Sequence, residues 1–233
     1  MKKIGILGGM APQSTAEYYR IITALCRQQG MGYRYPVIII YSLNFHEFIS
    51  QVESGNWLEV IGLLSEAINS LYNAGADFAV MASNTPHIVF NEVAGRSPIP
   101  LLSIAEETGR VARDFGFYTL GLFGTKFTMQ SDFYRNILSN KYGISVVTPE
   151  EADQEYIHSK IMTELVNNCI VEETRQELSR IARMMVDKEG IEALILGCTE
   201  LPLILSEGVV GIPIIDTTRI HAEAALKFAQ ADG

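Results

Sequence analysis

The sequence has few cysteines and no long apolar run. Its three cysteines, Cys26, Cys169 and Cys198, are odd in number and widely spaced, which argues against a disulfide framework. The longest apolar stretches, such as residues 37–41 and 194–196, have the length of strands and fall far short of the roughly 20 residues that a membrane helix needs. The apolar segment after Met1 is too short for a signal peptide and runs into a turn, so we expect a cytoplasmic protein.

Positive charge is also scarce. Lys and Arg number 18 against 27 Asp and Glu, and the formal net charge is −9. An acidic chain is a poor partner for nucleic acid or for an anionic membrane, and we expect neither as a partner. A small anionic substrate remains compatible with this charge, because a local site can be polar or positive on an acidic protein.

Cofactor motifs are absent as well. The glycines at positions 5, 8 and 9 do not have the spacing of a dinucleotide fingerprint, and no lysine stands in a recognisable pyridoxal-phosphate context. The four histidines show no metal-ligand spacing: they are His46, His87, His158 and His221. The residues therefore indicate neither a metal site nor a dinucleotide site, and they leave a pyridoxal-phosphate cofactor open.

The chain does contain an internal repeat. The segment Ile-Gly-Ile-Leu-Gly at 4–8 reappears 116 positions later as Leu-Gly-Leu-Phe-Gly at 120–124. The segment Ile-Pro-Leu-Leu-Ser at 99–103 reappears 113 positions later as Ile-Pro-Ile-Ile-Asp. Between these landmarks, Ser83 and Cys198 each follow a short apolar run and lie 115 positions apart. Nearly constant offsets over three landmarks indicate duplication of one α/β unit.

Strand-like and helical patterns alternate along both halves of the chain. The predicted strands are short apolar runs at 3–7, 36–41, 78–82, 99–102, 119–123, 144–147, 193–196 and 212–215. Apolar residues at helical spacing predict helices at 14–29, 58–74, 129–139, 152–167, 173–188 and 217–230. Continuous apolar strands alternating with helices predict parallel sheets covered on both faces.

This pattern predicts an α/β fold of two similar parallel-sheet domains related by pseudo-two-fold symmetry. With no Pro- or Ser-rich linker to separate them, we place the first domain at 1–100 plus 212–233 and the second at 101–211. Ligands of open parallel sheets bind beyond the carboxyl ends of the strands. If the halves face each other, four loops meet in one cleft, which we predict to be the active site: 8–10, 83–85, 124–125 and 198–200.

Cys198 is the first candidate for chemistry. An apolar-flanked cysteine is more often an inert buried residue, and Cys26 and Cys169, within helical patterns, keep that interpretation. Cys198 instead follows a strand, and Gly197 before it lets the backbone bend. A helix starting near Thr199 would aim N–H groups at the sulfur, which predicts a thiol pKa below its ordinary value of about 8.5.

Ser83 is the internal counterpart of Cys198, although a serine after a strand is also a common helix cap. Asn84 and Thr85 could bind a substrate carboxylate or serve as ordinary turn residues. The tight turn before Met10 would bring backbone close to a small anionic ligand. His87, one turn after Ser83, either orients the Ser83 loop or is a hydrogen-bonded residue behind it.

These motifs match a known family. They are the segment at 4–10, Ser-Asn-Thr-Pro-His at 83–87 against the family's Cys-Asn-Thr-x-His, Gly-Cys-Thr-Glu at 197–200, and Ile-Ile-Asp at 214–216. The chain resembles the aspartate/glutamate racemases over essentially its whole length, and its Cys-Thr-Glu form is closer to the aspartate or broad-specificity branch. The resemblance implies two α/β domains, a homodimer, a small amino-acid substrate, no cofactor, and two catalytic cysteines that flank the substrate Cα at the domain interface.

The implied mechanism removes the Cα proton with one thiolate and returns a proton from the opposite face. Hydrogen-bond donors must then stabilise the carbanion at the α-carboxylate, and the candidates are Asn84, Thr85 and Thr199. Thr125 and Thr128 are expected to contact the substrate from the second half. Glu200 beside the thiol would raise its pKa; it could also hold the substrate ammonium or orient a neighbour.

Two positions depart from the family pattern. Ser83 stands where most members have cysteine, and a hydroxyl is a far weaker acid than a thiol. The resemblance implies that Cys198 acts on the L face, so we predict faster proton abstraction from an L-amino acid than from its D enantiomer. The basic residue that some members use for the side-chain carboxylate falls near Tyr156 and Lys160. A single-thiol decarboxylase or cis–trans isomerase of the same superfamily, or a catalytically silent amino-acid-binding protein, are the alternatives.

Overall fold

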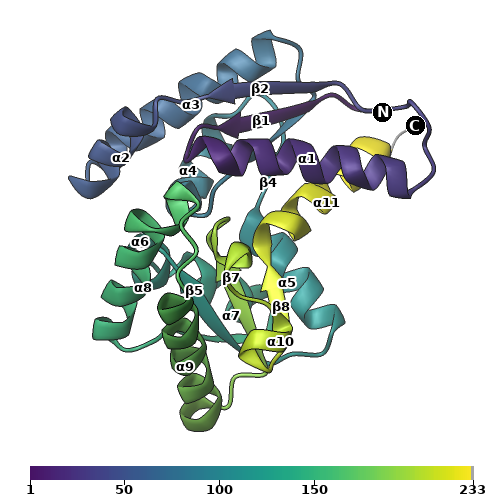
Figure 1. The fold of residues 1–233 in the computed structure, drawn as a ribbon. Helices are drawn as coiled ribbons and strands as arrows, with labels where there is room; N and C mark the ends of the chain where they lie inside the picture. The colour runs from purple at the N-terminus through teal and green to yellow at the C-terminus, as the bar shows by residue number, and fades with distance from the viewer. Residues whose placement is uncertain (232–233) are drawn as a thin grey trace. The chain divides into compact units, whose positions relative to one another are not determined.

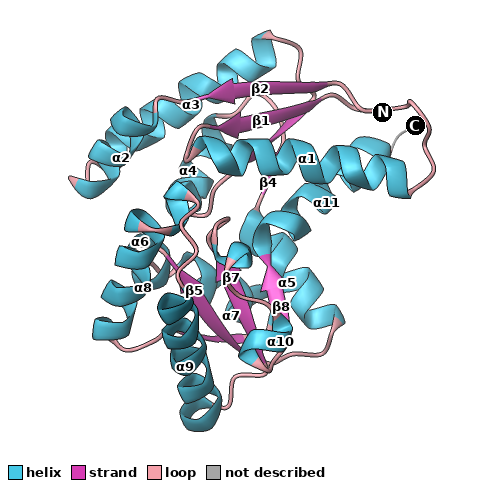
Figure 2. Ribbon diagram, viewed as in Figure 1, coloured by secondary structure: helices cyan, strands magenta, loops and turns pink. Residues whose placement is uncertain are grey.

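Two parallel β-sheets of four strands each form the framework of the protein (Figures 1 and 2). The structure, a computed structural model, describes residues 1–231. The chain divides into two units. The first is Met1–Ile104 together with the chain from Thr218 onward, and the second is Ala105–Thr217.

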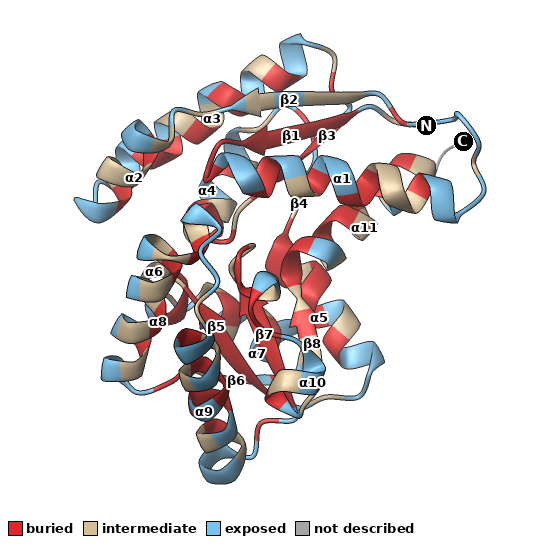
Figure 3. Ribbon diagram, viewed as in Figure 1, coloured by how far each residue is buried: buried red, intermediate tan, exposed pale blue. Residues whose placement is uncertain are grey.

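The sheet of the first unit has the strand order β2-β1-β3-β4. Its strands are β1 (Ile4–Gly8), β2 (Ile38–Ser42), β3 (Phe78–Met81) and β4 (Leu101–Leu102), and all neighbours are parallel. Every residue of β1 and β3 is buried, as Figure 3 shows for β1. Burial on both faces explains why these central strands read as continuous apolar runs.

The sheet of the second unit repeats this order as β6-β5-β7-β8. Its strands are β5 (Thr119–Gly124), β6 (Ser145–Val147), β7 (Ala193–Gly197) and β8 (Ile214–Asp216). The register repeats too: Ala79 pairs with Gly5 and Leu101, and Leu194 pairs with Gly121 and Ile214. The offsets between these partners are the 116, 115 and 113 positions of the sequence repeat. The predicted α/β fold with two similar parallel sheets is confirmed.

Helices cover the first sheet on both faces. They are α1 (Pro12–Gln28), α2 (Phe45–Glu53), α3 (Trp57–Asn73), α4 (Phe90–Arg96) and α11 (Thr217–Gln230), with the 3₁₀-helix η1 (Thr85–Val89). α1 and α11 lie side by side (Figure 1) and bury Tyr18, Ile22 and Leu226 against alternate strand residues such as Ile4 and Val80. α3 packs against β1, and it lies on the side of β1 and β2 away from α1 (Figure 1).

The second unit holds α5 (Ile104–Asp114), α6 (Lys126–Gln130), α7 (Phe133–Tyr142), α8 (Glu151–Thr163), α9 (Glu172–Glu189) and α10 (Glu207–Val210), with the 3₁₀-helices η2 (Leu165–Asn167) and η3 (Leu201–Leu203). α5 and α7 approach closely where Gly109 faces Tyr142, because a Cβ on Gly109 would lie 2.5 Å from the tyrosine ring. The Tyr142 hydroxyl donates to the Glu106 carbonyl at 2.9 Å. A glycine is therefore required at this helix contact.

The last helix of each half crosses to the other unit. β4 belongs to the first sheet, yet α5 after it packs in the second unit; β8 belongs to the second sheet, yet α11 packs in the first. The crossings fall at 104/105 and 217/218, whereas the sequence placed them at 100/101 and 211/212. The difference arises because the short strands β4 and β8 keep their pairing with β3 and β7 before the chain crosses. Among the described residues, no helix is long and apolar enough to cross a membrane.

Candidate functional site

Equivalent loops leave the carboxyl ends of β3 and β7. Ser83 follows β3 by two residues and precedes η1, and Cys198 follows β7 directly and precedes η3. The shared register makes Ser83 the structural counterpart of Cys198, because Ala79 and Leu194 occupy matching places in the two sheets. Both side chains are half-buried, and each follows a buried residue. The equivalence inferred from the sequence therefore holds at the level of strand pairing.

Cys198 is hydrogen-bonded to a carboxylate. Its thiol donates to Oε2 of Glu200 at 2.8 Å, and the Thr199 hydroxyl donates to the same oxygen, also at 2.8 Å. Glu200 is buried, whereas Thr199 is half-buried. A single carboxylate oxygen thus accepts two hydrogen bonds at the end of β7.

The pKa of Cys198 lies well above the ordinary thiol value. Desolvation is the largest cause, and the charge of Glu200 and its hydrogen bond to the thiol act in the same direction. The backbone N–H groups of Thr199 and Glu200 oppose this rise, but only the single 3₁₀ turn η3 follows. The expected lowering of the thiol pKa is therefore wrong, while the expectation that Glu200 raises it is confirmed.

The strand ends around Cys198 require glycine. Gly124 and Gly197 are register partners, and a Cβ on Gly197 would lie 2.9 Å from the Phe123 carbonyl oxygen. The half-buried Thr125 begins α6, and its hydroxyl accepts from the Thr128 N–H at 3.3 Å. Thr128 is fully buried and its hydroxyl lies 3.2 Å from that of Thr125. Thr125 therefore remains a candidate for contacting the ligand, whereas the fully buried Thr128 packs behind it.

The Ser83 loop is anchored from behind by His87. Asn84 and Thr85 are buried, and the Asn84 side chain makes no capping bond to η1. The Ile104 N–H donates to Nε2 of His87 at 3.1 Å, so Nδ1 carries the proton and donates to the Ser83 carbonyl at 2.9 Å. Burial, with a smaller effect from the charge of His221, lowers the pKa of His87 to about 3. His87 is thus a neutral residue that holds the Ser83 backbone, as the sequence suggested.

The turn after β1 is held by a residue that the sequence did not single out. The Gly9 N–H donates to the Thr15 hydroxyl at 2.8 Å, and a Cβ on Gly8 would lie 2.2 Å from the same oxygen. Gly9 has a φ of +87°, which favours glycine. Met10, predicted to contact the ligand, is buried directly after this turn.

Lys160, near which the family resemblance placed a substrate-binding cation, is already paired with the residue that ends its helix. It forms an ion pair with Glu164, which also accepts a 2.6 Å hydrogen bond from the Thr174 hydroxyl. Its Nζ lies 5.6 Å from the centre of the Tyr156 ring. Within residues 1–231, no group of three or more His, Cys, Asp or Glu side chains is placed to hold a metal ion.

Comparison with known proteins finds amino-acid racemases and their homologues. A family model described as Asp/Glu/Hydantoin racemase matches residues 7–225. The broad-specificity amino-acid racemase RacX of Bacillus subtilis is 25% identical over 232 residues, covering 96% of each chain. An aspartate racemase homologue from Pyrococcus horikoshii is 36% identical with a TM-score of 0.85, covering 98% of this chain and 99% of that one. The Picrophilus torridus aspartate racemase is 27% identical with a TM-score of 0.78, covering 97% and 94%.

Proposed function

Because the chain belongs to the Asp/Glu/Hydantoin racemase family, we propose that it interconverts the enantiomers of aspartate, glutamate or a related amino acid without a cofactor. The observation that carries the proposal is the register-matched pair Ser83 and Cys198, each a half-buried polar side chain that follows a central strand of its sheet. In the proposed reaction one of these side chains serves each face of the substrate Cα.

Cys198 is the proposed base for the L enantiomer. The resting thiol keeps its proton, since desolvation and Glu200 both oppose the thiolate. We infer that the proton passes along the 2.8 Å hydrogen bond to Glu200 when the substrate ammonium lies closer to the sulfur than to the carboxylate. The thiolate then takes the Cα proton, and the electron pair of the broken C–H bond remains on the substrate as a carbanion.

The carbanion partitions between two outcomes. A proton returned by the Cys198 thiol regenerates the L enantiomer, and a proton given by the Ser83 hydroxyl on the opposite face yields the D enantiomer. Solvent then reprotonates Ser83 and takes the proton held by Glu200, which restores both groups. Asn84, Thr85, Thr125 and Thr199 are the proposed donors to the α-carboxylate, where fixed donors stabilise developing charge. Serine can donate to a carbanion but is a poor base, so the proposed enzyme forms the carbanion faster from the L enantiomer than from the D enantiomer.

Deuterium exchange at Cα tests this function. L- and D-aspartate and L- and D-glutamate are incubated in heavy water with the wild-type protein and with Cys198→Ala, and loss of the Cα proton is followed by NMR. The expected result is exchange that is faster from one or both L enantiomers and that Cys198→Ala abolishes. Equal exchange from both enantiomers, or exchange that survives Cys198→Ala, contradicts the proposed roles.

Ser83 also fits a single-thiol reaction such as a decarboxylation or a cis–trans isomerisation, which needs only Cys198. Absence of exchange with all four amino acids, in wild type and in Ser83→Cys alike, favours that second candidate. If the amino acids nevertheless bind, the silent binding protein is favoured. A homodimer is proposed from the family resemblance, and sedimentation of the purified chain tests it.

A further inference from the structure

A buried chain of hydrogen bonds begins at Tyr18 on α1. The Tyr18 hydroxyl lies 2.8 Å from Nδ1 of His221 on α11, and Nε2 of His221 lies 3.0 Å from the Leu102 carbonyl oxygen. A carbonyl can only accept, so Nε2 carries the proton and Nδ1 accepts from Tyr18. Both side chains are fully buried. The Leu102 carbonyl therefore fixes the tautomer of His221, and burial, which lowers the pKa of His221 to about 4, keeps the ring neutral.

The chain continues to Ser83. Two residues after Leu102, the Ile104 N–H donates to Nε2 of His87, and His87 donates from Nδ1 to the Ser83 carbonyl. The His87 and His221 rings meet edge to face with centroids 5.7 Å apart. Two pairs of hydrogen bonds, joined through the backbone of residues 102–104, thus connect α1 and α11 to the backbone of the proposed proton donor.

The second unit holds a corresponding arrangement. Tyr134 on α7 is fully buried and hydrogen-bonded to the side chains of Thr108 and Thr217. The Thr217 hydroxyl donates to the Leu196 carbonyl at 2.8 Å, so it accepts from Tyr134. Leu196 lies two residues before Cys198. This second series of hydrogen bonds therefore ends on β7, the strand that directly precedes the proposed base.

The two arrangements match through the sequence repeat. Tyr134 lies 116 positions after Tyr18, and His221 lies 113 positions after Thr108, which are the offsets of the repeated strands. Each tyrosine meets its partner on the helix that crossed from the other half, α11 in one unit and α5 in the other. The buried cluster around Tyr18 is otherwise apolar and includes Ile22, Ala222 and Ala225. Apolar side chains of similar size could fill this space, so packing alone does not require the polar chain.

We propose that Tyr18 and His221 are positioning residues for Ser83, and that Tyr134 is the positioning residue for Cys198. Each unit orients its own proton-transfer group through a buried tyrosine. The inference rests on the proposed racemase function. Proton transfer depends steeply on the alignment of donor and acceptor. Removing a hydrogen bond from one of the two series should therefore slow proton transfer at one face of Cα and not at the other.

Paired variants test this assignment. Tyr18→Phe and Tyr134→Phe make the same chemical change in two fully buried tyrosines, in the wild-type chain and on Ser83→Cys. The L substrate is incubated in heavy water, and two quantities are measured: the rate of Cα proton loss, which reports on Cys198, and the fraction of deuterated product that is D, which reports on position 83. The fraction is independent of how much protein is folded.

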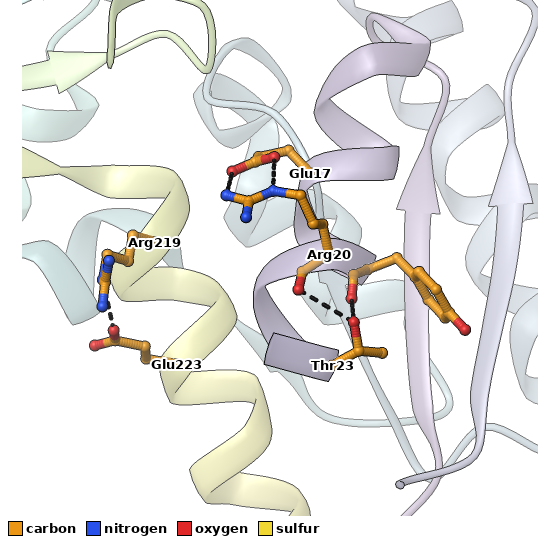
Figure 4. Close-up of polar contacts among 6 residues, drawn as sticks. Glu17, Arg20, Thr23, Arg219 and Glu223 are labelled. Carbon is orange, nitrogen blue, oxygen red and sulfur yellow. Dashed lines mark hydrogen bonds and ion pairs between the residues drawn. The ribbon is translucent and has the colours of Figure 1, made fainter. Parts of the chain in front are cut away.

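Tyr18→Phe should lower the D fraction about threefold or more while the rate of proton loss changes by less than about twofold. Tyr134→Phe should lower the rate of proton loss without lowering the D fraction. Glu223→Gln is the control on α11, because Glu223 pairs with Arg219 on the exposed side of that helix (Figure 4), and it should change neither quantity. An unchanged D fraction in Tyr18→Phe, or a fall of the D fraction in Tyr134→Phe, overturns the assignment.

Imidazole ¹⁵N NMR separates failure of this inference from failure of the proposed function. The expected spectrum has the proton on Nδ1 of His87 and on Nε2 of His221, and Tyr18→Phe should shift the signals of both rings. If the spectrum behaves so but no Cα exchange occurs in any variant, the hydrogen-bond chain stands and the racemase function fails. If wild type racemises and Tyr18→Phe shifts only His221, the positioning role fails alone.

Discussion

The thiol of Cys198 donates its proton to the carboxylate of Glu200 over 2.8 Å. The sulfur is thereby kept as a thiol by the same group that would have to receive its proton during catalysis. Glu200 should consequently have opposite effects on thiolate formation and on turnover, and the two can be measured separately.

Glu200→Gln removes the charge that raises the Cys198 pKa and leaves the desolvation in place. We expect the pH midpoint for alkylation of Cys198 by iodoacetamide to move to lower pH, while remaining above that of an exposed thiol. Exchange from the L substrate should nevertheless fall roughly 100-fold, because the proton acceptor is lost. The measurement is made on Cys169→Ala, since Cys169 is exposed and would also react.

Glu150→Gln serves as the control, because Glu150 is an exposed carboxylate whose loss changes the net charge by the same amount. An alkylation midpoint that moves equally in both variants contradicts a direct effect of Glu200. A midpoint that falls together with undiminished exchange shows that Glu200 is not the proton acceptor.

The buried histidines predict how stability depends on pH. Burial lowers the pKa of His87 to about 3 and that of His221 to about 4, whereas both titrate near 6.5 once unfolded. The unfolded chain therefore binds protons that the native protein does not, and the stability present above pH 6.5 is lost as the pH falls toward 4. Each histidine contributes a slope of at most about 1.4 kcal/mol per pH unit.

Urea unfolding between pH 7 and 4.5 checks this expectation. His221→Gln should flatten the pH dependence of the free energy of unfolding over this range, whatever its effect at pH 7. His46→Gln, at an exposed position of α2, should leave the slope as in wild type. Equal slopes in wild type and His221→Gln would contradict the assignment of a neutral buried His221.

Sequence patterns located the central strands and the two catalytic candidates because β1, β3, β5 and β7 are buried on both faces and read as apolar runs. They did not predict α5, whose polar sequence follows the two-residue strand β4 without a turn signal. The sign of the Cys198 pKa shift depends on the burial of the Glu200 carboxylate, which no spacing reveals. The hydrogen bond between Tyr18 and His221 joins residues 203 positions apart. In the sequence, only the repeat offsets of these residues relate them to each other.

The contact between α5 and α7 makes a prediction about stability. Gly109→Ala places a Cβ 2.5 Å from the Tyr142 ring, so the helices must separate, and we expect a loss of about 1–3 kcal/mol. Gly62→Ala is the matched control, because Gly62 is an exposed residue of α3 with no atom within 4 Å of the added Cβ. There the higher helix propensity of alanine should add up to about 1 kcal/mol. Thermal unfolding of both variants measures this difference. A Gly109→Ala protein that is as stable as Gly62→Ala contradicts the close contact between Gly109 and Tyr142.

Replacing the hydroxyl of Ser83 by a thiol should raise the rate at which the Cα proton is removed from the D enantiomer. A thiolate at position 83 can remove a proton, which the serine hydroxyl does poorly near neutral pH, so Ser83→Cys should raise Cα exchange from the D substrate by roughly 100-fold or more. Exchange from the L substrate, which depends on Cys198 in the proposed mechanism, should change far less. The comparison is made by following D- and L-aspartate and D- and L-glutamate separately in heavy water.

Ser83→Ala completes the test because it removes the proton donor without adding a base. It should keep exchange from the L substrate while lowering the D fraction of the product, and exchange from the D substrate should stay at or below the wild-type level. If Ser83→Cys leaves D-substrate exchange unchanged, position 83 does not face the reacting carbon. If Ser83→Ala gives the same D fraction as wild type, water rather than Ser83 delivers the second proton, since a methyl group has no proton to give.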